Sequence, residues 1–88
     1  MKVRRVPWVD EHVEGGESAV LVGDQVFVLS ELATTILAAI GESTVELADV
    51  ATVLGEAFGP PPEGSDLVAA TESAVRELSD QGLLTYPL

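Results

Sequence analysis

The first third of the chain alternates valine-rich stretches with glycine, and this pattern predicts β-strands. β-branched side chains fit the pleated surface of a sheet, whereas glycine marks turns. We expect strands at residues 3–9, 18–22 and 25–29. The last two are separated only by Gly23-Asp24, a spacing typical of a β-hairpin. This third of the chain therefore predicts a three-stranded antiparallel sheet.

The remaining two thirds show helical periodicity. Apolar side chains recur at three- and four-residue spacing over residues 31–40, 44–58 and 66–81, so three helices are expected. Each begins after a residue that caps helix N-termini: Ser30 for the first, Ser43 with Glu46 in a capping box for the second, and Ser65 or Asp66 for the third. A sheet followed by three helices in 88 residues predicts one α+β domain over residues 1–88.

The predicted third helix carries a wide apolar face. At about 100° per residue the face covers roughly 160°, whereas packing on one side needs only a little more than about 100°. Its members are Leu67, Val68, Ala70, Thr71, Ala74, Val75 and Leu78. Val68 and Val75 make one flank bulky, whereas Ala70 and Ala74 make the other flank small. The small flank leaves room for another segment to lie beside the helix.

The composition is strongly acidic. Fifteen acidic and four basic residues give a formal net charge of −11. Such a surface repels nucleic-acid backbones and anionic lipids, so neither is an expected partner. No apolar run reaches the roughly 18 residues of a membrane span, and the N-terminus lacks the apolar core of a signal peptide. Because cysteine is also absent, which fits a reducing compartment, we expect a cytoplasmic protein.

Few residues offer catalytic or metal-binding chemistry. His12 is the only histidine, and although its neighbours are acidic, a metal site usually needs further converging ligands. The serines at predicted helix caps lack a base and an orienting group, which a nucleophile requires. We therefore expect no catalytic residue, no metal and no cofactor. Trp8, the only tryptophan, is expected to be a half-buried core residue of the first strand.

Several short motifs recur together along residues 18–84. The hairpin strands lead through Leu29-Ser30 to Ala33, a "TVEL" helix start occupies residues 44–47, and Leu78 is followed by "GLL" at 82–84. On these motifs the chain resembles the PqqD-like family, also called recognition elements of ribosomally made, post-translationally modified peptides (RiPPs). Serine at position 30 departs from the commoner asparagine, but either residue can cap a helix.

The resemblance implies a winged-helix-like fold of three strands and three helices, and a binding function without catalysis. In the family, the leader segment of a precursor peptide adds as an extra strand along the third strand, beside the third helix. The residues expected to contact the peptide are Gln25, Val26, Phe27, Val28 and Leu29 on the strand and Leu67, Ala70, Thr71, Ala74 and Leu78 on the helix. The implied partners are the precursor leader peptide and a separately encoded modifying enzyme or leader peptidase.

Two alternative functions remain open at this point. A winged-helix DNA-binding regulator would share the fold, but residues 66–81 contain one arginine and four acids, unlike a recognition helix. A purely structural subunit of a protein complex is the second alternative. An exposed edge strand could also pair with a second copy of the chain and give a homodimer.

Overall fold

The computed structural model describes residues 1–6, 10–60 and 64–88. Its elements in chain order are β1 (Lys2–Arg5), β2 (Asp10–Glu14), β3 (Glu17–Val22), β4 (Gln25–Leu29), α1 (Glu31–Ile40), β5 (Val45–Glu46), α2 (Leu47–Phe58), α3 (Leu67–Asp80) and β6 (Leu84–Thr85). The α+β class and the three helices are confirmed. Trp8, the end of the predicted first strand and most of the proline run after α2 lie outside the described residues.

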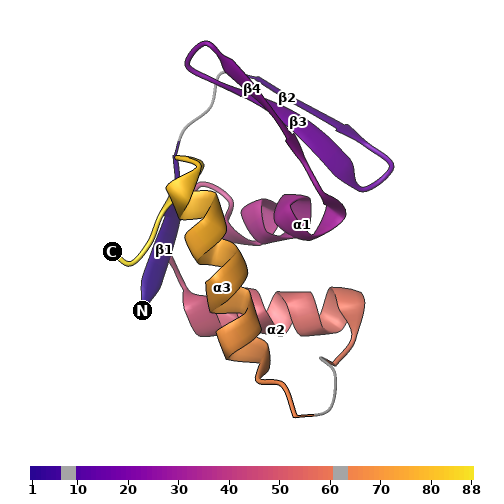
Figure 1. Ribbon diagram of the computed structural model, residues 1–88, viewed down its shortest axis with the longest axis vertical. Helices are drawn as coiled ribbons and strands as arrows, with labels where there is room; N and C mark the ends of the chain where they lie inside the picture. The colour runs from indigo at the N-terminus through magenta and orange to yellow at the C-terminus, as the bar shows by residue number, and fades with distance from the viewer. Residues whose placement is uncertain (7–9, 61–63) are drawn as a thin grey trace.

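The strands form two antiparallel sheets instead of the single sheet predicted. One has the order β2-β3-β4 and the other β5-β1-β6, and they lie apart in Figure 1. The prediction that the first strand joins the hairpin is wrong, because β1 pairs with β5 at Val3 and with β6 at Arg4 and Arg5. Val3 is fully buried and belongs to the same core cluster as Leu84. The pairing of β1 with β6 therefore buries apolar side chains from both ends of the chain, which is favourable because it removes apolar surface from water.

Strand β2 was not predicted, because its five residues, DEHVE, carry little strand propensity and all of them are exposed. It pairs with β3 in continuous register from Asp10↔Leu21 to Glu14↔Glu17. The two-residue connection is Gly15-Gly16, and both glycines have positive φ, 61° and 84°. Such backbone geometry suits a tight hairpin. Strand β2 therefore forms because the turn brings it to the free edge of β3, and not because of its own side chains.

The predicted hairpin of β3 and β4 is confirmed, with five paired positions from Ser18↔Leu29 to Val22↔Gln25. At its turn only Gly23 adopts a positive φ, 62°. Along β4, Leu29 is buried and Phe27 is half-buried, whereas Val26 and Val28 are 68% and 82% exposed. The strand thus turns Phe27 and Leu29 toward α1 and the core, and Val26 and Val28 away from them.

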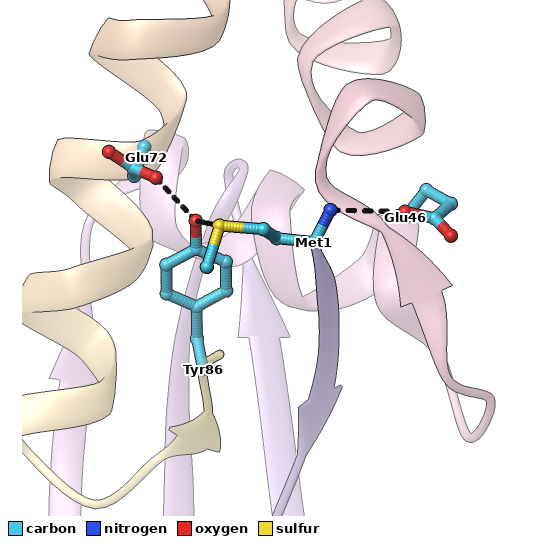
Figure 2. Close-up of polar contacts among 4 residues, drawn as sticks. All are labelled: Met1, Glu46, Glu72 and Tyr86. Carbon is cyan, nitrogen blue, oxygen red and sulfur yellow. Dashed lines mark hydrogen bonds and ion pairs between the residues drawn. The ribbon is translucent and has the colours of Figure 1, made fainter. Parts of the chain in front are cut away.

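Two of the three predicted helix caps are confirmed. The Ser30 Oγ accepts a hydrogen bond from the Ala33 amide at 3.2 Å, and Asp66, not Ser65, accepts one from the Val68 amide at 2.9 Å. The capping box at Ser43 is wrong, because residues 45–46 form β5 and α2 begins at Leu47. The Glu46 carboxylate instead lies 3.3 Å from the N-terminal ammonium (Figure 2). The pairing of residues 45–46 with β1 thus replaces the local capping pattern, whereas an exposed ion pair of this kind adds little.

The end of the chain is attached to α3 and to the first residue. The Tyr86 hydroxyl donates a hydrogen bond to the Glu72 carboxylate and lies 3.5 Å from the Met1 Sδ (Figure 2). Just before Tyr86, residues Leu84–Thr85 form β6, which pairs with β1. These contacts join β1, α3 and β6 into one packed side of the molecule, separate from the β2-β3-β4 sheet (Figure 1).

Candidate functional site

Strand β4 has an open edge. It is the last strand of the β2-β3-β4 sheet, and no other strand among the described residues pairs with its outer side. In an antiparallel hairpin with a two-residue turn, the two residues that flank the turn are joined by two main-chain hydrogen bonds, and so is every second pair along the ladder. In the pairs between them, the main-chain N–H and C=O groups point away from the partner strand. The register Val22↔Gln25 therefore directs the main-chain groups of Val26 and Val28 to the open edge. These groups are the donors and acceptors that an added strand would use.

An apolar groove lies beside α3. A hollow of about 270 Å³ is lined by Leu32 of α1, by Leu54, Phe58, Gly59 and Pro60 at the end of α2, and by Leu67, Ala70, Thr71 and Ala74 of α3. The small flank predicted for the third helix thus faces open space. The opposite wall comes from α1 and α2 rather than from the strand.

A second hollow, of about 70 Å³, continues the groove toward β4. It is lined by Ser30, Leu32, Ala33, Ile36, Ala74, Glu77 and Leu78. Because Leu32 and Ala74 border both hollows, the groove reaches from Ser30, directly after β4, to Pro60 after α2. The open edge and the groove therefore meet at the junction of β4 and α1.

The five helix residues expected to contact a peptide all border this groove, although to different depths. Ala70 is exposed, Leu67 and Ala74 are half-buried, and Thr71 and Leu78 are buried. The Thr71 hydroxyl donates to the Leu67 carbonyl at 2.8 Å, so it already has a partner within the helix. None of residues 25–29 lines either hollow. The strand set offers a main-chain edge, whereas the helix set offers an apolar surface.

The α2 wall was missed by the sequence reasoning. Phe58 ends the apolar stripe of α2, yet 46% of it is exposed at the mouth of the groove. The position of Phe58 directly before Gly59 could have indicated this exposure from the sequence, because a large side chain at the end of a helix often lies beyond the core. Gly55 brings this wall close to α3, since a Cβ there would lie 2.9 Å from the Leu67 Cδ2.

The residues weighed for catalysis or metal binding do not converge. His12 Nε2 lies 3.4 Å from the Glu14 carboxylate, and both side chains are well exposed. In the described parts of the chain, no group of three His, Cys, Asp or Glu side chains could hold a metal ion. Ser30 serves as the α1 cap. No helix among the described residues is long and apolar enough to cross a bilayer.

No protein-family model, curated protein or solved structure matches this chain. The likeness to PqqD-like domains accordingly rests on the sequence motifs alone. The open edge of β4 and the apolar groove beside α3 are the structural features that bear on function.

Proposed function

We propose that this protein is a non-catalytic peptide-binding module. It captures the leader segment of a ribosomally synthesised precursor peptide by strand addition along β4. It then presents the peptide to a separately encoded modifying enzyme or leader peptidase. The observation that carries this proposal is the open edge of β4, which meets an apolar groove at Ser30.

The two surfaces supply different parts of recognition. Main-chain hydrogen bonds along an edge strand give affinity that depends little on sequence, whereas the side chains that enter a groove give selectivity. A bound peptide that pairs with β4 and continues past the C-terminal end of that strand would enter the groove between Leu32 and Ala74. Most of the groove lining is apolar, so it favours peptides with apolar side chains at that end.

The charge of the protein supports a peptide as the ligand. With a formal charge of −11, the surface favours neutral or basic partners over polyanions. The only basic residue of α3 is Arg76, and its guanidinium lies 3.7 Å from Glu72 and 5.4 Å from the centre of the Tyr86 ring. Arg76 is thus turned toward Tyr86 on the packed side of the molecule, and it lines neither hollow of the groove.

A titration tests this function directly. The isotopically labelled full chain is titrated with the synthetic leader of a precursor encoded beside this gene, and amide shifts are followed by NMR. We expect the perturbed amides to cluster on residues 25–29 and 67–78. Perturbations confined to residues 43–58, with β4 silent, would show that the proposed site is wrong.

A matched pair of variants on α3 sharpens this test. Ala70 lines the groove and Ala69 does not, although both are exposed alanines of the same helix. Ala70→Leu should fill the groove and weaken leader binding by about 1–3 kcal/mol, the usual cost of overpacking a formed site. Ala69→Leu should leave the affinity within about twofold, because surface changes away from a site cost little. Equal losses in the two variants would contradict the groove.

A further inference from the structure

The β2-β3-β4 sheet has one covered face and one open face. Helix α1 lies against β3 and β4 on the inner face, where Val20 and Leu29 are buried. The alternate side chains of the sheet point away from α1. We call this surface the outer sheet face and define it by Asp10, His12, Glu14, Glu17, Ala19, Leu21, Val26 and Val28.

The centre of the outer sheet face is apolar. The cross-strand pairs Ala19↔Val28 and Leu21↔Val26 place four apolar side chains side by side. Two shallow hollows, of about 350 and 240 Å³, lie along it, and both are bordered by His12 and Ala19. Exposed valines occur singly on many proteins, but a contiguous, hollowed set marks an interaction surface.

The border of the outer sheet face is negatively charged. Asp10, Glu14 and Glu17 lie along its β2 side and the adjoining turn. All four basic residues of the sequence are at positions 2, 4, 5 and 76, which lie on β1 and α3. An apolar centre beside an acidic border is complementary to an apolar stripe flanked by lysine or arginine.

We propose that the outer sheet face docks a basic amphipathic helix of a second protein. A sheet buries an apolar face most simply under a helix, as α1 already does on the inner side. The docking surface itself does not depend on the proposed function. Only the identification of the second protein as the enzyme that acts on the captured peptide rests on that function. A peptide strand added to β4 would turn every second side chain to this same face. The docked enzyme would therefore meet the peptide beside Val26 and Val28.

The test uses two synthetic helical peptides of the same length as probes. Both carry leucines along one face, and the flanking positions are lysine in one peptide and glutamate in the other. Titrated into the labelled full chain, the lysine peptide should shift the amides of residues 10–14, 19, 21, 26 and 28. It should bind at least about tenfold more tightly than the glutamate peptide, and this advantage should shrink as salt screens the charges.

Valine-to-threonine variants provide the control for the apolar centre. Replacing Val26 and Val28 together by threonine keeps the side-chain shape but removes apolar surface, so binding of the lysine peptide should weaken about tenfold. Val68→Thr changes a valine of α3 that is 44% exposed, and it should have no such effect. Shifts elsewhere on the protein, equal binding of both peptides, or equal losses in both variants would overturn the docking surface.

The two proposals fail separately. If the precursor leader shifts β4 and α3 while the lysine peptide leaves the outer sheet face unchanged, the docking surface is wrong and peptide capture stands. If the lysine peptide binds the outer sheet face while the leader leaves β4 and α3 silent, the docking surface stands and peptide capture is wrong.

Discussion

At the scale of single residues, Tyr86 has the most distinctive environment. Its hydroxyl donates to the Glu72 carboxylate (Figure 2). The Arg76 guanidinium lies over its ring. The hydrogen bond to Glu72 raises the pKa of Tyr86, desolvation and the charge of Glu72 raise the pKa further, and Arg76 opposes these effects. A deprotonated tyrosine could not donate this bond, so attachment of the chain end to α3 depends on the phenol staying protonated.

The raised pKa predicts a loss of stability at alkaline pH. The Tyr86 hydrogen bond should contribute fully below about pH 10, the ordinary tyrosine pKa, because the phenol is then protonated in both folded and unfolded chains. Above that pH the unfolded chain loses its proton first, so the contribution disappears as the pH rises through the higher folded pKa. Thermal unfolding measured across this range should show the decline.

Tyr86→Phe gives the control for this alkaline decline. It should be less stable than the native protein at neutral pH and should lose less stability above about pH 10. Since Tyr86 is the only tyrosine, tyrosinate absorbance reports its pKa without interference from other tyrosines. An identical alkaline decline in both proteins, or an absorbance titration at the ordinary pKa, would contradict the role given to this hydroxyl.

At the scale of elements, the sequence predicts the helices and the hairpin, which local periodicity and capping residues define. It does not predict strand pairing between segments that are distant in the chain. The β3–β4 hairpin and the limits of α1 and α3 follow from local residues such as Gly23, Ser30 and Asp66. The pairing of β1 with β6 joins residues some eighty positions apart, which no local pattern reports. Strand β2 carries no apolar alternation because none of its side chains is buried.

The candidate site shows the same division between local and distant information. The small flank of α3 is a local pattern, and the structure places it on a groove. The opposite wall, formed by Leu32 and Phe58, depends on how three helices meet. The face on which Val26 and Val28 lie could not be read from the uninterrupted apolar run of residues 26–29, because alternation is visible only when polar residues mark one face.

A proline in β4 tests the strand edge itself. Val28→Pro removes an amide that the register directs outward, so the β3–β4 ladder should survive. Leader binding should weaken by about 0.5–1.5 kcal/mol, the net value of one main-chain hydrogen bond. Val13→Pro places the same change at the corresponding position of β2, the opposite edge of the sheet, and should leave leader affinity unchanged. Isothermal titration calorimetry distinguishes the two, and an equal effect of both prolines would rule out strand addition at β4.

At the scale of the whole molecule, the distribution of charge disfavours contact with DNA. In a winged-helix regulator, the third helix and the hairpin approach the phosphates. Here the exposed charged residues of the α3 region are mainly acidic, with Asp66, Glu77 and Asp80. The β2–β3 hairpin adds further carboxylates at 10, 11, 14 and 17. Both parts of the molecule that would have to contact DNA would therefore repel it.

We accordingly expect no measurable binding to duplex DNA at physiological salt. Specific DNA-binding proteins gain affinity by releasing counterions from phosphates that lysine or arginine neutralises. Three of the four basic residues here lie on β1, which belongs to neither α3 nor the β2–β3 hairpin. Fluorescence anisotropy with a pool of random duplexes should show no binding at micromolar protein, and lowering the salt should change little. A sequence-specific complex of nanomolar affinity that weakens as salt rises would establish the regulator and refute the peptide-binding proposal, because no acidic face could produce that salt dependence.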